Sequence, residues 1–211
     1  MTTSSTPLAA QTTTGRRRLI NGNSQLLYRG MKRLAENCLL NIKNKSHSVS
    51  AQLQVPDGGA DGVIISQGGA FVGWSLYLKA GKPTYHYNFA GLQRFTIDGE
   101  TKVPAGQHQV RMEFAYDGGG LAKGGTVTLY LDGNNIGQGR VEATIPMIFS
   151  GDETCDLGSD TASPVSPDYT PETSHFTGKI EWVQIDIAEA AEHLDHLITP
   201  EDRLRIAMAR Q

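Results

Sequence analysis

The densest group of residues able to do chemistry is an acidic stretch around residue 155. It holds four carboxylates, Asp152, Glu153, Asp156 and Asp160. Calcium takes several carboxylate and carbonyl oxygens from a single loop, so the stretch is a candidate calcium site. Its spacing is not that of an EF-hand loop, and acids in turns also accept hydrogen bonds from their own backbone. The stretch is therefore either a calcium loop or a solvated turn.

The same acids could in principle serve a glycosidase, which needs two carboxylates roughly 5 to 9.5 Å apart. Glucanases built on β-sandwiches place that pair in a Glu-x-Asp-x-Glu segment or a close variant of it. The run from Glu153 to Asp156 reads Glu-Thr-Cys-Asp and does not reproduce that segment. A glycosidase is thus disfavoured.

A second group of candidates consists of polar and aromatic side chains on strand-like runs. These could line a shallow groove for a glycan or an aryl sulfate; the alternative is that they are ordinary solvent-facing or inter-domain residues. An ion pair between Arg111 and Glu113 on one strand face would contribute little by itself. The candidates are Tyr77, His86, Asn88, Arg111 and Tyr130.

Trp182 belongs with these candidates because of its place in an alternating run. If Val183 and Ile185 face the core, alternation turns Trp182 outward, where a tryptophan often anchors an interface. A β-bulge beside it would instead turn the ring inward. The sequence leaves both readings open.

Only two cysteines are present, Cys38 and Cys155. Neither has a second thiol or a histidine at the short spacing of a zinc site. Nothing in the sequence pairs them in a disulfide, so we expect two separate thiols.

Most of the chain has the two-residue period of β-strands, interrupted by Gly, Pro, Asp and Asn. About ten short strands are predicted, and the 24 glycines suit that many turns. The predicted strands are 48–55, 63–67, 71–79, 84–89, 94–97, 108–116, 127–131, 139–143 and 178–187.

Two hairpins fix which side chains share a face. Ala80-Gly81 and Asp132-Gly133 supply residues that accept positive φ in tight turns. Alternation then puts Trp74, Leu76 and Leu78 on one face. Each such side chain contributes roughly 1.5 to 3 kcal/mol when fully buried. The pattern predicts an all-β, two-sheet antiparallel sandwich.

The two ends of the chain differ from this middle part. Residues 1–27 begin with Thr, Ser, Ala and Gln and are predicted to be a disordered or weakly ordered tail. Residues 28–187 are predicted to form the sandwich. Residues 188–211 have a helical period with a strong helix start at Thr199-Pro200, so a short helical tail is predicted.

Composition and charge limit the classes of partner that the chain is expected to bind. The net charge is −3 with both signs scattered, which disfavours nucleic acid and anionic membranes as partners. No apolar run approaches the roughly 20 residues of a membrane span, and no signal peptide is evident. A soluble location, cytoplasmic or periplasmic, is expected without a choice between them.

Two resemblances run through these strands. The segments 73–78, 126–133 and 176–185 resemble the central hairpin, middle strand and closing strand of laminin-G-like or concanavalin-like jelly rolls. That resemblance implies a fold and leaves the function open.

The closer resemblance is to the C-terminal domain of bacterial arylsulfatases of the sulfatase family. It runs through residues 28–211 in order, and it implies a partner, a sulfatase catalytic domain in cis or in trans. The segments that carry it are 34–37, 42–47, 67–69, 87–89, 114–120, 123–125, 152–154, 156–161 and 196–201.

The residues of sulfatase chemistry are missing from this chain. The family converts a cysteine in Cys-x-Pro-x-Arg to formylglycine and holds a divalent metal in its catalytic domain. Cys38 is followed by Leu-Leu-Asn-Ile and Cys155 by Asp-Leu-Gly-Ser, so neither fits. We therefore expect no resident cofactor beyond the calcium candidate, no catalytic residue, and no turnover by the chain alone.

The leading functional hypothesis from the sequence is a non-catalytic accessory domain that packs on a sulfatase catalytic domain. The alternative is a free-standing, lectin-like carbohydrate-binding module, suggested by the sandwich and its aromatic strands.

Overall fold

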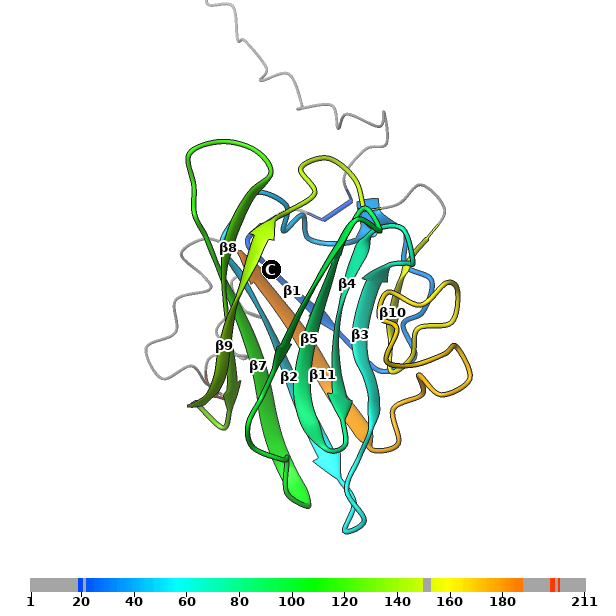
Figure 1. Ribbon diagram of the computed structural model, residues 1–211. Helices are drawn as coiled ribbons and strands as arrows, with labels where there is room; N and C mark the ends of the chain where they lie inside the picture. The colour runs from blue at the N-terminus through cyan, green and yellow to red at the C-terminus, as the bar shows by residue number, and fades with distance from the viewer. Residues whose placement is uncertain (1–18, 21, 150–152, 188–197, 200, 202–211) are drawn as a thin grey trace, which may run out of the picture.

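The computed structural model describes residues 19–20, 22–149, 153–187, 198–199 and 201 of the chain. In this part, eleven strands form two antiparallel sheets that face each other (Figure 1), which confirms the predicted sandwich. The strands are β1 (Ser24–Leu27), β2 (His47–Val55), β3 (Gly62–Gly68), β4 (Gly73–Lys79), β5 (Lys82–Phe89), β6 (Gln93–Asp98), β7 (Gly106–Tyr116), β8 (Lys123–Leu131), β9 (Asn134–Ala143), β10 (Cys155–Leu157) and β11 (Lys179–Ile187). Besides these strands, the described residues between 22 and 187 contain one short 3-10 helix, Glu36–Cys38.

The order of the strands places distant parts of the chain side by side. The six-stranded sheet runs β1-β11-β2-β7-β8-β9, and the five-stranded sheet runs β10-β3-β4-β5-β6. β11 lies between β1 and β2, so the last strand closes the sheet against the first two. At this edge the Ile187 N–H donates to the Asn23 carbonyl at 2.8 Å.

The predicted hairpins form as expected. β4 ends at Lys79 and β5 begins at Lys82, with positive φ at Ala80 (50°) and Gly81 (78°). β8 and β9 are joined in the same way through Asp132 and Gly133. Positive φ at both central residues is the geometry whose twist matches that of the flanking strands.

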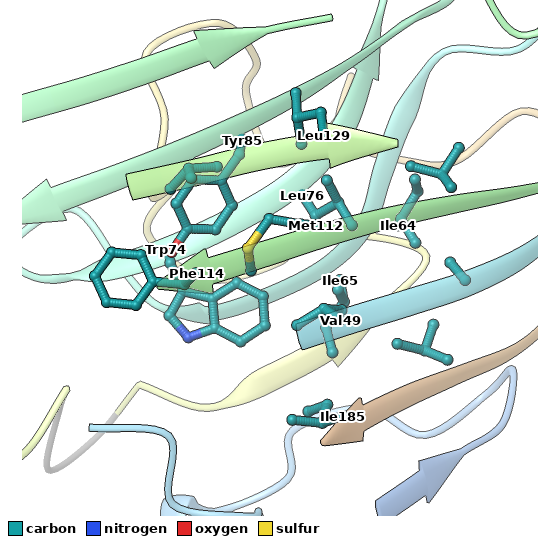
Figure 2. Packing of buried hydrophobic residues seen from close by; sticks show 14 of the residues in the cluster. Val49, Ile64, Ile65, Trp74, Leu76, Tyr85, Met112, Phe114, Leu129 and Ile185 are labelled. Carbon is teal, nitrogen blue, oxygen red and sulfur yellow. The ribbon is translucent and has the colours of Figure 1, made fainter. Parts of the chain in front are cut away.

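The core lies between the two sheets, as Figure 2 shows for side chains from both. Trp74 and Leu76 on β4 point into it, as alternation predicted, and Met112 on β7 faces them from the other sheet. The Trp74 ring stacks on Tyr85 with centroids 6.3 Å apart, and its Nε1 donates to Gln67 Oε1 at 3.0 Å. Because the indole N–H is hydrogen-bonded, burying the ring leaves no unpaired polar group in the core.

Two short strands were not predicted. β1 lies within the range 1–27, which the sequence suggested was a tail, and it pairs with β11. Its Leu27 faces the core, while Ser24 and Leu26 face away from it. β10 adds the edge of the five-stranded sheet through pairs from Cys155↔Gln67 to Leu157↔Ile65.

The segment after β10, residues 158–178, has no regular strand or helix. It lies beside β3 and β10 on the side away from the six-stranded sheet (Figure 1, yellow to orange). Backbone hydrogen bonds tie it down: Val63 N–H donates to the Ser174 carbonyl at 2.8 Å, and Thr177 N–H to the Asp61 carbonyl at 2.9 Å. This segment covers a sheet face that alternation alone would leave exposed.

The predicted helical tail, 188–211, lies outside the described residues apart from 198–199 and 201. Ile198 is buried, and its N–H donates to Gln109 Oε1 at 2.7 Å. Among the described residues, there is no helix of the length and apolarity that crossing a membrane would require.

Candidate functional site

The outer face of the five-stranded sheet carries three of the predicted binding residues, Tyr77, His86 and Asn88. All three are buried, which corrects the expectation that they are accessible. Alternation assigned their face correctly, but the 158–178 segment packs on this face over Ser75 and Tyr77. We call the polar residues of this region the closed layer; it consists of the buried Ser75, Tyr77, Thr84 and His86 from the sheet and, from the segment, the buried Asp160 and Ser166, the partly buried Tyr169 and the solvent-accessible Asp168.

Two tyrosines hold the closed layer together. Tyr77 and Tyr169 meet edge to face with ring centroids 5.3 Å apart. The Tyr77 hydroxyl donates to Asp168 Oδ2 at 2.5 Å, while the Tyr169 hydroxyl lies 2.9 Å from both Ser75 Oγ and Asp160 Oδ2. Burial, followed by these carboxylates, raises the pKa of both phenols, so neither is an acid near neutral pH.

His86 and Asn88 have structural roles in this face. Burial lowers the pKa of His86 to about 4, and its Nδ1 lies 2.8 Å from Thr96 Oγ1. Asn88 joins two turns, since its Nδ2 donates to the Ala70 carbonyl at 2.8 Å and its Oδ1 accepts from Gly91 N–H at 3.0 Å. Because both the amide nitrogen and the amide oxygen of Asn88 are already hydrogen-bonded, the side chain has little capacity left to bind a ligand.

The acidic stretch is divided among local hydrogen bonds. Asp156 accepts from Arg33 N–H at 2.6 Å and from Thr161 Oγ1 at 2.8 Å, and Asp160 Oδ2 accepts from Val165 N–H at 2.9 Å. Glu153 Oε1 accepts from Ser163 Oγ at 2.7 Å, and Asp152 lies outside the described residues. Asp156 and Asp160 are buried, so the stretch is not solvated at these two positions, but both carboxylates accept from nearby backbone N–H groups, as the turn alternative predicted.

No three His, Cys, Asp or Glu side chains in the described residues come close enough together to hold a metal ion. The two cysteines are free thiols, and burial raises the pKa of Cys155. A buried thiol with a raised pKa is a poor nucleophile.

The outer face of the six-stranded sheet holds the other predicted residues. Arg111 on β7 lies directly opposite Tyr130 on β8. The Arg111 guanidinium donates from Nε to Glu113 Oε1 at 2.7 Å and from Nη1 to Ser50 Oγ at 2.9 Å. Its side chain is only 1% exposed, whereas that of Glu113 is 22% exposed. The cation is thus held beneath a carboxylate that reaches solvent.

Tyr130 and its neighbours continue this face toward the sheet edge. Burial, and then Glu113, raises the pKa of Tyr130, so its hydroxyl keeps its proton. Thr128 lies opposite Glu113 on one side and Gln138 on the other, and Gln138 Nε2 donates to Thr128 Oγ1 at 3.1 Å. We call this region the open strip; it comprises the partly exposed Glu113 and Tyr130 and the exposed Gln138 and Arg140, with the buried Thr128 between them.

Gln138 was not among the residues singled out in the sequence. The Asp132-Gly133 turn alone would put Thr128 opposite Gly137; a register shift between Leu129 and Tyr130 puts Thr128 opposite Gln138 instead, and nothing in the sequence indicates that shift.

Trp182 lies on the same outer face, farther toward β1. The predicted bulge is present as a register shift between Ile180 and Trp182, and Val183 and Ile185 point into the core. Trp182 stays opposite Gln52 on the outer face, yet it is only 4% exposed. It therefore lies in the covered part of this face and outside the open strip.

Comparison with known proteins bears on the fold alone. No protein-family model matches the chain, and no curated protein matches it. Among solved structures it is similar to the CBM40 of Ruminococcus gnavus IT-sialidase bound to α2,3-sialyllactose, with a TM-score of 0.51 and 12% identity over 83% of this chain and 93% of that one.

It is also similar to a mutant NanB sialidase from Streptococcus pneumoniae, with a TM-score of 0.51 and 14% identity over 80% of this chain but 26% of that one. These similarities agree with a concanavalin-like jelly roll, as predicted. None of them links the chain to arylsulfatases.

Proposed function

We propose that the chain is a glycan-binding module of the lectin-like kind, with its ligand lying across the open strip. The observation that carries this proposal is the ordered group Arg111, Glu113 and Tyr130. Its buried guanidinium orients a partly exposed carboxylate beside a protonated phenol. This is the sequence's second hypothesis, and the fold similarity to a sialyllactose-bound CBM40 supports it over the first.

The chemistry of these groups suits sugar hydroxyls. A carboxylate accepts hydrogen bonds from adjacent hydroxyls, and hydrogen bonds to charged groups are among the strong ones. The amide of Gln138 can both donate and accept, and the ring of Tyr130 offers an apolar surface with a polar end. Since Glu113 is already fixed by Arg111, binding a sugar would cost little ordering of the carboxylate.

The proposal is tested by a glycan array with the purified chain, followed by calorimetric titration of any glycan that binds, with α2,3-sialyllactose included. Tyr130→Ala and Glu113→Gln should each weaken binding about tenfold or more, as expected for residues at the centre of a site. Repeating the titration with added calcium and with a chelator shows whether glycan binding depends on calcium held by the acidic stretch.

Phe71→Ala is the matched control, because Phe71 is 81% exposed in the β3–β4 turn of the other sheet. It should bind as the unmodified chain does. Binding that survives both open-strip variants, or no binding to any glycan, would overturn the proposal. Changing His86 is not informative here, because that ring is buried in the closed layer.

A second candidate function is the sulfatase accessory domain that the sequence resemblance implies. One structural observation favours a protein partner: four large apolar side chains are exposed in segments at one end of the sandwich, after β3, β5, β7 and β9 (Figure 1, upper end). They are Phe71, Leu92, Leu121 and Met147.

Hydrogen bonds link two of these segments. Asn44 joins the segments of Leu121 and Met147, since it accepts from Ala122 N–H at 2.9 Å and donates to the Pro146 carbonyl at 2.8 Å. Surfaces of this kind often mark protein interfaces.

This second candidate is tested by mixing the chain with a sulfatase catalytic polypeptide and measuring association by ultracentrifugation. The double variant Phe71→Ser and Leu92→Ser should abolish association, while Tyr130→Ala should leave it intact. The chain alone should hydrolyse no aryl sulfate. Association unaffected by the double variant, or hydrolysis that follows the pure chain, would exclude this candidate.

A further inference from the structure

A basic cleft lies beside β10, outside both the closed layer and the open strip. Its floor is formed by Leu157 and Ile180. Arg29 and Lys32 stand on one side, and His175 and Phe176 on the other. The cleft has a volume of about 200 Å³, far more than the roughly 10–15 Å³ that one ordered water needs by the same measure.

Both walls of the cleft are fixed to the edge strand. The first wall is a turn in which Met31 N–H donates to the Tyr28 carbonyl at 3.2 Å, and Leu157 N–H donates to the Met31 carbonyl at 3.2 Å. The second wall is joined to the floor where Phe176 N–H donates to the Gly158 carbonyl at 3.0 Å. A site built on anchored backbone needs little rearrangement to bind.

A glycine allows the second wall to approach so closely. Gly62 has φ of 104°, and a Cβ built on it would lie 2.4 Å from the His175 carbonyl oxygen. Any other residue would push the His175 segment away from β3. The backbone at His175 is therefore held close against β3.

The charge in the cleft has one sign. Arg29, Lys32 and His175 are exposed, and none of their side chains makes an ion pair or hydrogen bond within the part of the chain that the structure describes. The nearby acids are already engaged: Asp156 accepts from Arg33 N–H and Thr161, and Asp61 Oδ1 accepts from Gly81 N–H at 3.0 Å. In a chain of net charge −3, such a group of basic side chains favours an anion.

We propose that this cleft binds a tetrahedral oxyanion carried on a sugar-sized ring, such as a sulfate ester or a phosphate monoester. Three basic side chains from two walls can each meet a different oxygen of such a group, which a two-oxygen carboxylate cannot satisfy as fully. The remaining volume accommodates the ring, and Phe176 gives it an apolar surface. The site is separate from the open strip and does not depend on glycan binding there.

The test is calorimetric titration of the full chain at low ionic strength with inorganic sulfate, inorganic phosphate, glucose 6-sulfate, glucose 6-phosphate and glucose. We expect both sugar esters to bind more tightly than the free ions and glucose not to bind. The relative affinities of sulfate and phosphate identify the source of the oxyanion. Binding should weaken as salt is added, because exposed charges are screened over about 10 Å at 0.1 M.

The double variant Arg29→Gln and Lys32→Gln should weaken ester binding at least tenfold, and His175→Gln should weaken it further. The matched control is Arg94→Gln with Lys102→Gln, which removes the same charge from exposed positions on and beside β6, at the opposite edge of the sheet. All these positions are exposed, so thermal denaturation should show unchanged folding.

Equal losses in the cleft and control variants would mean that net charge alone attracts the anion, and the proposal would be wrong. The absence of ester binding at millimolar concentration would also overturn it. Tyr130→Ala separates the two proposals, because it should abolish glycan binding and leave ester binding intact. Each proposal can therefore be disproved independently of the other.

Discussion

The two sheets of the sandwich carry similar polar residues on their outer faces and use them differently. On the five-stranded sheet, Tyr77 and Ser75 are buried under Asp168 and Tyr169. On the six-stranded sheet, Tyr130 and Glu113 remain partly exposed over an equally ordered Arg111. A tyrosine beside a carboxylate is thus buried on one face and partly exposed on the other.

This difference shows that a segment can close a sheet face largely through polar contacts. Apart from the buried Val165 and the ring contact of Tyr77 with Tyr169, hydrogen bonds from these two hydroxyls to Asp168 and Asp160 hold the segment on the sheet. Buried polar groups of this kind specify one arrangement, because each lost partner leaves an unsatisfied group behind.

Truncating the closed layer should have the largest effect. Tyr169→Ala removes the ring contact with Tyr77 and two hydroxyl contacts, so it should lower the free energy of unfolding by about 3–5 kcal/mol. Tyr130→Ala, the same change on the open strip, should cost well under half as much. Urea denaturation of both variants measures the difference. Similar losses for the two would show that the faces do not differ in this way.

The pH dependence of stability gives the second largest effect. Burial raises the pKa of Asp160 to about 6, above its unfolded value of 3.8, so the folded protein holds a proton that the unfolded chain releases. The associated stability is fully present below about pH 4 and is lost as pH rises through about 6, by up to about 3 kcal/mol.

Asp160→Asn should remove this component, so the variant should gain stability relative to the unmodified protein between pH 4 and 6. His47, whose pKa burial lowers to about 4, acts in the opposite direction and is common to both proteins, so it cancels in the difference. Thermal denaturation across this range makes the measurement. A difference that does not change with pH would show that Asp160 is ionised throughout.

Arg111 lies at the boundary between covered and open regions, and its removal should have an intermediate effect. Arg111→Met removes the hydrogen bonds that Arg111 donates to Glu113 and Ser50, but Glu113 is partly exposed and can turn to solvent. We expect a loss of about 1–3 kcal/mol in the free energy of unfolding, together with weaker glycan binding. Chemical denaturation and titration check the two parts. A stable variant with full affinity would remove Arg111 from the proposed site.

Single hydrogen bonds give the finest comparison. Ser166→Ala removes a partner of Tyr77 in the closed layer and should cost about 1 kcal/mol. Gln138→Ala removes a bond to Thr128 at an exposed position and should stay within about 0.5 kcal/mol. Denaturant midpoints measured side by side distinguish the two. A larger loss for Gln138→Ala would reverse the assignment of the faces.

Alternation and turn chemistry predicted the strands and which side chains share a face. Trp74, Leu76 and Leu78 were correctly predicted as core because their run alternates up to the Ala80-Gly81 turn. β1 and β10 escaped prediction because runs of four and three residues are too short to show a period. Their pairing is set by partners more than 80 residues away in sequence.

The sequence predicted part of the candidate site: it found residues on the correct strand faces but not which of those faces are covered. Arg111 and Tyr130 were found because alternation assigns each of them to a polar strand face, and the pairing of β7 with β8 then places them opposite each other. Tyr77 and His86 were placed on the correct face and expected to be accessible, because nothing in the Ser-, Thr- and Pro-rich run 158–178 indicates that it packs on a sheet. The basic cleft joins Arg29 to His175 across β10, so only the structure reveals it.

The pairing of β1 with β11 also has a use for protein engineering. Asn23 and Ile187 are joined by a backbone hydrogen bond, although 164 residues separate them in sequence. A short Gly-Ser linker could therefore join these positions in a variant that omits residues 1–22 and 188–211, the buried Ile198 included, and new ends could be opened in the turn at residues 118–120. Such a circular permutant would keep all the strands and move the chain ends to the β7–β8 turn of the six-stranded sheet, where a fused protein or a fluorophore would sit away from the basic cleft beside β10.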